Sequence, residues 1–103
     1  MERIMKKFHT KELDELFEAI LSLNSREECY LFFEDVCTIK ELRDISQRLK
    51  TAKMLSDGAN YAEIGKVTGM STATISRVSK CLEYGEGGYR TIIDRLKEKE
   101  QKQ

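Results

Sequence analysis

NYAEIGKVTGMSTATISRVSKCL, residues 60–82, is the stretch that decides the fold of this 103-residue chain. It has the pattern of two short helices joined by a glycine-containing turn. Asn60 can cap the first helix, and Glu63 three residues later completes a capping box. Gly69 suits the left-handed conformation in which a helix often ends, and Ser71 is a good N-cap for the second helix. This order of signals predicts a helix-turn-helix at about residues 60–83.

Each of the two helices has apolar residues that can face inward. The first is expected to bury Ile64 and Val67, with the small Gly65 where the two helix axes come closest. The second is expected to bury Ile75, Val78 and Leu82, whose spacing of three and four residues places them on one helical face.

The opposite face of the second helix is small, hydroxylated and basic. No acidic residue occurs between Glu63 and Glu83. Small side chains let a helix enter a major groove, while hydroxyl and basic groups meet base edges and phosphates. The alternative is an ordinary helical hairpin with a solvated outer face, but the ordered signals favour DNA binding. The residues predicted to contact DNA are Lys66, Ser71, Thr72, Ala73, Ser76, Arg77 and Lys80.

The charges are unevenly distributed along a chain whose formal net charge is zero. Residues 1–35 hold nine acids and five bases, whereas residues 36–82 hold four acids and eight bases. The basic excess therefore coincides with the helix-turn-helix and the segment before it, as expected for a surface that binds phosphate.

The absence of proline and the abundance of Glu, Lys and Leu predict an all-α fold. Three further helices precede the helix-turn-helix, beginning after Thr10, Ser25 and Thr38, and a last one begins at about Tyr89, which makes six. We expect residues 1–9 to form a flexible leader and residues 10–103 a single helical domain.

The first two helices are strongly apolar. This surface could complete the core of a monomer, but pairing with a second copy is favoured because helix-turn-helix proteins commonly bind DNA as two-fold dimers.

The cysteines and the histidine give no indication of a metal site or of a catalytic site. Cys29, Cys37 and Cys81 lack metal-ligand spacing and are expected to be buried free thiols in a reducing cytoplasm. The single histidine, His9, is expected to be solvated. No catalytic constellation, metal site, phosphate-binding loop, signal peptide or membrane span is predicted.

The segment TIKELRDISQRLKTAKMLSDGANYAEIGKVTGMSTATISRVSKCL, residues 38–82, resembles the tryptophan repressor superfamily, and in particular its short Trp-repressor-like members of the YerC/YecD type. The resemblance extends over nearly the whole chain after the leader. It implies an intertwined homodimer whose N-terminal helices interlock, and a cytoplasmic transcription regulator that binds a pseudo-palindromic operator.

The resemblance also implies an effector cleft. In the repressor, two arginines grip tryptophan between the third helix and the recognition helix; they match Arg48 and Arg77, and a pocket threonine matches Thr38. Val78 stands where the repressor has a glycine, and Cys81 replaces a pocket serine. These departures predict that tryptophan is not the co-repressor, while a different small-molecule effector stays open. An alternative for Arg48 is a surface ion pair with Asp44, four residues earlier.

The leading hypothesis is therefore a homodimeric, sequence-specific regulator that binds double-stranded DNA and uses no cofactor. The rival hypothesis is a protein-interaction module that docks on the transcription machinery without reading an operator. The basic, acid-free face favours DNA, because docking faces more often carry large apolar or aromatic anchors.

Overall fold

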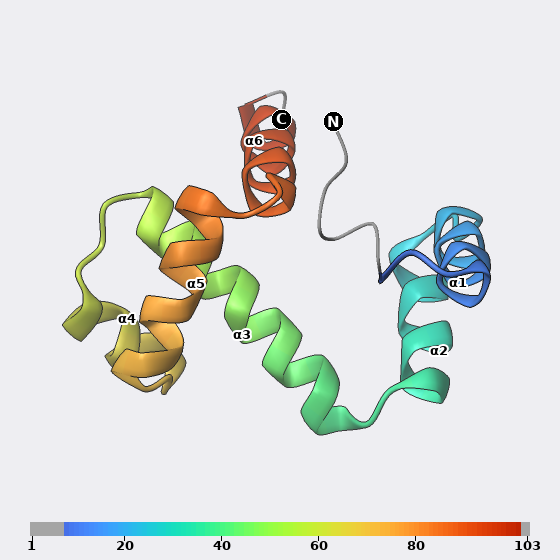
Figure 1. The fold of residues 1–103 in the computed structure, drawn as a ribbon, viewed down its shortest axis with the longest axis horizontal. Coiled ribbons are helices and arrows are strands. Elements are labelled where there is room, and N and C mark those ends of the chain that lie inside the picture. Colours follow the sequence, from blue (N-terminus) through green and yellow to red (C-terminus); the bar gives the residue numbers. More distant parts are fainter. Residues whose placement is uncertain (1–7, 102–103) are drawn as a thin grey trace. The chain divides into compact units, whose positions relative to one another are not determined.

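The computed structural model describes residues 8–101, in which six helices and no strands are found (Figure 1). The helices are α1 (Lys11–Leu21), α2 (Arg26–Val36), α3 (Ile39–Ser56), α4 (Tyr61–Thr68), α5 (Thr72–Tyr84) and α6 (Gly88–Gln101). The all-α prediction and the predicted number of helices are confirmed. The chain divides into two compact units, an N-terminal one that ends at Ile39 and a C-terminal one that begins at Lys40.

The N-terminal unit consists of α1 and α2, and both helices begin at the caps that the sequence predicts. The Thr10 hydroxyl accepts a hydrogen bond from the Leu13 N–H at 3.1 Å, and the Ser25 hydroxyl accepts from the Glu28 N–H at 3.1 Å. The Glu28 carboxylate accepts from the Asn24 N–H at 2.8 Å, one residue before the cap. Both helices carry acids in the first turn, where the helix dipole stabilises negative charge.

Neither α1 nor α2 contains a fully buried residue. Phe32 and Phe33 contact each other edge to face with ring centroids 5.3 Å apart, yet both remain half-buried. Phe17, Leu21 and Leu31 are 54%, 77% and 65% exposed. Both helices are amphipathic, and the apolar side of such a helix is normally covered by other parts of the protein. The exposed fractions show that this cover is missing in the single chain.

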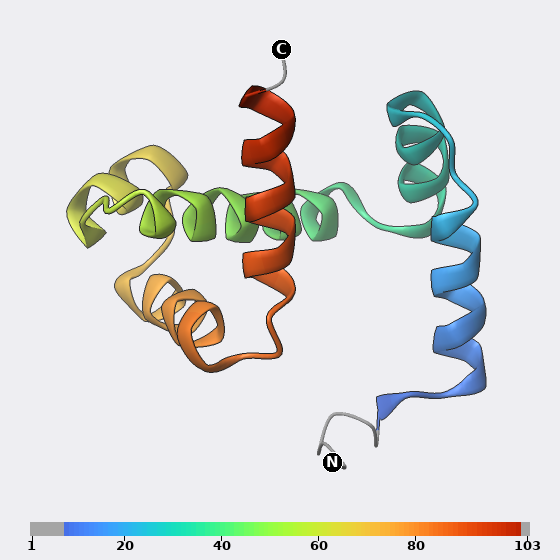
Figure 2. The same ribbon diagram turned by 90° about the horizontal axis from the view of Figure 1, so that it is seen from above.

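The core of the C-terminal unit joins three helices. Ala52 of α3, Val78 and Leu82 of α5, and Ile93 of α6 form a buried cluster, with exposed fractions of 7% or less. Leu55 and Tyr89 cover its edge. Figure 2 shows α6 running across α3 in this unit. Burial of a side chain such as Ile93 is worth about 1.5–3 kcal/mol, so these few residues fix how the helices pack.

The helix-turn-helix has the caps that the sequence predicts. The Asn60 side chain accepts from the Glu63 N–H at 2.9 Å, and the Glu63 carboxylate accepts from the Asn60 N–H at 3.4 Å, which completes the capping box. Gly69 ends α4 with φ of +75°, and the Ser71 hydroxyl accepts from the Thr74 N–H at 3.2 Å. Local hydrogen bonds alone therefore define where both helices begin.

One prediction about the inner face of α4 is wrong. Ile64 is fully buried, but Val67 is 57% exposed. Gly65 and Thr68 are half-buried, so the inner face runs through Ile64, Gly65 and Thr68. The Thr68 hydroxyl donates to the Ile64 carbonyl oxygen at 2.7 Å and accepts from the Met70 N–H at 3.2 Å. These bonds let a polar side chain take an inward position that the apolar pattern assigns to Val67.

The cysteines are free, as predicted, but they are not buried. Cys29 and Cys37 are half-buried and Cys81 is exposed. An apolar neighbourhood in the sequence does not ensure burial, because the same helix has an outer side. His9 is exposed, as predicted. Most of the predicted leader, residues 1–7, lies outside the described residues, and the single domain over residues 10–103 stays a prediction.

The two glycines of the helix-turn-helix should respond differently to alanine. Gly69→Ala places a side chain in the left-handed region and is expected to cost about 1–2 kcal/mol of stability. At Gly65 an added Cβ would lie 3.5 Å from the Met70 carbonyl oxygen, an ordinary contact. Gly65→Ala is therefore expected to stabilise the protein by about 0.5–1 kcal/mol, because alanine favours helix interiors. Denaturant unfolding of both variants measures the difference, and equal destabilisation would contradict this account of the turn.

Candidate nucleic-acid interface

The outer side of α5 is accessible over its whole length. Thr72, Ala73, Arg77 and Lys80 are exposed, while Ser76 is half-buried. Ile75, Val78 and Leu82 of the same helix are buried, as the predicted spacing requires. The sequence therefore assigns the two sides of α5 correctly. Lys66 of α4 is exposed as well.

The basic groups on this side are available for a ligand. Among the described residues, none of Lys66, Arg77 and Lys80 forms an ion pair, and α5 has no acid in its first turn. Cationic side chains without partners are suited to neutralise phosphates, because each contact displaces a counterion from the nucleic acid.

The hydroxyl groups near the start of α5 differ in what they can still bind. Besides its capping bond, the Ser71 hydroxyl donates its hydrogen to Thr74 Oγ1 at 3.1 Å. Ser71 is thus occupied with positioning the helix. Thr72 and Ser76 make no side-chain hydrogen bond with other described residues, which leaves their hydroxyls able to donate and to accept.

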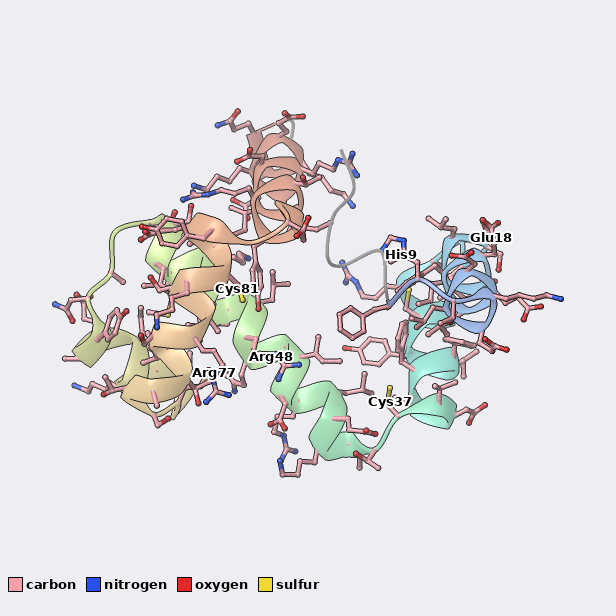
Figure 3. The ribbon with its side chains drawn as sticks, in the orientation of Figure 1. His9, Glu18, Cys37, Arg48, Arg77 and Cys81 are labelled. Carbon is pink, nitrogen blue, oxygen red and sulfur yellow. The ribbon has the colours of Figure 1, made fainter. Side chains whose placement is uncertain are left out.

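A second polar feature lies between α3 and α5. An open cleft of about 520 Å³ brings together Arg48 of α3 with Arg77, Val78 and Cys81 of α5. Figure 3 shows the Arg48 and Arg77 side chains in the space between these two helices. Four of the five predicted effector-cleft residues therefore line one cavity. Thr38 belongs to the N-terminal unit, and its role in the cleft stays a prediction.

Arg48 does not form the ion pair with Asp44 that was the alternative to a ligand role. Asp44 pairs with Lys40, whose Nζ lies 3.0 Å from Asp44 Oδ2. Asp44 also lines the cleft. The cleft thus holds two arginines and one carboxylate, and the carboxylate is already paired.

Several residues of the cleft were not predicted. They are Asp44, Gly69, Met70, Ser71, Thr74 and Tyr89. Thr74 lies one turn before Val78 on α5, so the helical period could have found it. Tyr89 comes after the glycine-containing loop, and no local pattern could have placed it there.

A partly buried hydrogen bond connects the turn to α3. The Thr51 hydroxyl, whose residue is fully buried, lies 3.1 Å from the Met70 sulfur and donates to it. Met70 is the first residue after the glycine that ends α4. The contact holds the turn of the helix-turn-helix against α3, and the sequence gives no local signal for it.

Within residues 8–101, no group of three or more His, Cys, Asp and Glu side chains could hold a metal ion, and no helix is long and apolar enough to cross a membrane.

These features define an all-α protein with a helix-turn-helix whose recognition helix presents a basic outer side. The comparisons with known proteins agree. The Trp repressor protein family model matches residues 11–97, and the chain belongs to this family. It is 54% identical over 94 residues to YerC of Bacillus subtilis, described as an uncharacterized protein, and the match covers 91% of this chain and 90% of YerC.

Two solved structures are similar to this chain. A candidate Trp repressor from Staphylococcus aureus superposes with a TM-score of 0.87 at 49% identity, covering 93% of this chain and 96% of that one. A TrpR-like protein from Eubacterium eligens superposes with a TM-score of 0.85 at 50% identity, covering 88% of this chain and 94% of that one. The Trp-repressor-like fold is therefore established.

We predict that L-tryptophan does not bind in the cleft with micromolar affinity. Val78 is 3% exposed and belongs to the core cluster, so an indole at this wall of the cleft would have to displace a packed side chain. Overpacking of this kind costs about 1–3 kcal/mol. Calorimetric titration of the folded, full-length protein measures the affinity. Micromolar binding with one tryptophan per chain, together with tighter DNA binding, would show that the cleft accepts the indole.

Proposed function

We propose that this protein is a homodimeric, sequence-specific transcription regulator that binds double-stranded DNA and acts as a repressor. The observation that carries the proposal is the outer side of α5, which is exposed, has no acid from Thr72 to Leu82 and is basic at Arg77 and Lys80. Membership of the Trp repressor family supports the same function. We infer a cytoplasmic protein that regulates transcription and is not an enzyme.

The proposed interaction uses the two ends of α5 differently. A recognition helix enters the major groove with its N-terminal residues towards the base edges. Thr72, Ala73 and Ser76 would then lie against bases, and Arg77 and Lys80 against phosphates. The 13 residues of α5 span about 20 Å, long enough to serve both. Lys66 of α4 adds a further phosphate contact.

The exposed apolar surface of the N-terminal unit supports the homodimer. Phe17, Leu21 and Leu31 are more than half exposed, and α1 and α2 bury no residue completely. Covering such surface with a second copy contributes about 25 cal/mol for each Å² of apolar area removed from water, before the cost of association is subtracted. Interlocked N-terminal helices would also place two recognition helices across one two-fold axis.

We further propose that DNA binding needs no effector. Val78 packs with Ala52, Leu82 and Ile93, which fixes α5 against α3 and α6 by the chain's own side chains. An effector that acts by setting the recognition helix would have to supply this packing from outside the chain. The buried valine makes that step unnecessary here.

One observation favours the rival function, docking on the transcription machinery. Val67 and Tyr61 of α4 are 57% and 38% exposed, so the helix-turn-helix carries two large apolar side chains at its surface. A protein partner could use them as anchors. The DNA-binding proposal remains preferred, because docking does not account for the unpaired basic groups of α5.

Replacing the basic residues of α5 tests the DNA contacts. Arg77→Ala and Lys80→Ala are each expected to weaken binding and to reduce the slope of log affinity against log salt by about 0.9, the effect of one lost phosphate contact. Fluorescence anisotropy with a duplex oligonucleotide at several salt concentrations measures the slope. Lys99→Ala, in the last turn of α6, is the control and should leave the slope unchanged. Unchanged slopes in both test variants would mean that α5 does not face the DNA.

A charge placed on the apolar side of α1 tests the homodimer. Phe17→Lys is expected to yield monomers, because Phe17 is 54% exposed in the single chain and would be covered only by a second copy. Glu18→Lys, at the adjacent exposed position, is the control and should stay dimeric. Light scattering measures the mass and circular dichroism the helix content. A monomeric wild-type protein, or a Phe17→Lys dimer of unchanged affinity, would contradict the proposed interface.

A further inference from the structure

The first six positions of the recognition-helix motif contain no side chain able to read a base through paired hydrogen bonds. Residues 71–76 are Ser, Thr, Ala, Thr, Ile and Ser. Guanine is usually read by Arg or Lys, adenine by Asn or Gln, and the cytosine amino group by Asp or Glu. None of these types occurs before Arg77. Arg77 itself lines the cleft together with Arg48. This position suits contact of Arg77 with the phosphate backbone of the DNA.

What this segment does present is methyl groups. Thr72 and Ala73 are exposed at the start of α5, and each carries a methyl group. Ile75 is buried, and the Ser71 hydroxyl is occupied with the cap and with Thr74. The free hydroxyl of Ser76 can donate or accept and therefore distinguishes bases poorly. Within residues 71–76, the accessible chemistry that discriminates between bases is thus apolar.

We propose that this protein selects its site through the C5-methyl groups of thymine, with Thr72 and Ala73 as the specificity-determining residues. Thymine is the only standard base that offers a methyl group in the major groove, and alanine and the threonine methyl are its usual apolar partners. The small side chains bring the helix backbone close to the groove floor, so these short groups reach the base edges. The inference rests on the proposed DNA binding by α5.

The test uses the full-length protein and a duplex that it selects from a random-sequence library. Thymines in each half-site are replaced one at a time by deoxyuridine, which pairs identically with adenine but lacks the methyl group. Deoxyuridine at a thymine that the protein contacts should raise the Kd for the duplex about fourfold, because one methyl group is no longer buried. A thymine outside the half-sites is the matched control and should give no change.

Two substitutions at Thr72 show whether this residue makes the contact. Thr72→Ser keeps the hydroxyl and removes the methyl, so one of the deoxyuridine penalties should disappear. Thr72→Val keeps a methyl and removes the hydroxyl, so all penalties should persist. Ala73→Gly should remove the penalty at a different thymine, with helix content checked by circular dichroism.

The results separate the inference from the proposed function. Tight, specific binding that is indifferent to deoxyuridine at every half-site position would overturn the thymine reading and leave the DNA-binding function standing. Penalties that persist in Thr72→Ser and Ala73→Gly would overturn the assignment to these residues. Failure to select any DNA would refute the proposed function and the inference with it.

Discussion

The packing of Val78 and Leu82 on Ala52 and Ile93 is the contact on which the rest of the C-terminal unit depends. Ala52 is fully buried, and its small side chain allows α5 to lie close to α3. Once α5 is held there, its outer side must face solvent, and the cleft with Arg48 and Arg77 forms beside it. The Thr51–Met70 hydrogen bond adds a second attachment at the start of the recognition helix.

In the proposed regulator, this packing does by side chains of the protein what a bound ligand would otherwise have to do. A bound effector loses translational and rotational freedom when it orders a helix. A side chain already attached to that helix has no such loss, so the oriented state does not depend on effector concentration. The cleft with Arg48 and Arg77 is still present, but the packing of Val78 positions α5 without a ligand in the cleft. If α5 contacts DNA as proposed, its outer side is then presented whether or not an effector is bound.

The features that sequence reasoning predicted well are local. The caps at Thr10, Ser25, Asn60 and Ser71 and the left-handed Gly69 are set by residues within four positions, and all are found. Burial was predicted less well, because it depends on which surfaces meet. Val67 is exposed where Thr68 turns inward, and Cys81 is exposed although the next residue, Leu82, is buried. Met70 and Tyr89 entered the cleft only through contacts between distant segments.

We propose that the protein's own core holds α5 in the position in which it would contact DNA. The most direct measurement is the selection of bound genomic fragments by purified protein freed of small molecules, performed with and without an extract of cellular metabolites. If the core alone positions α5, the same palindromic fragments should be recovered in both conditions, with equal affinity. Recovery only when the extract is present would contradict it, because an effector would then be needed to position the recognition helix.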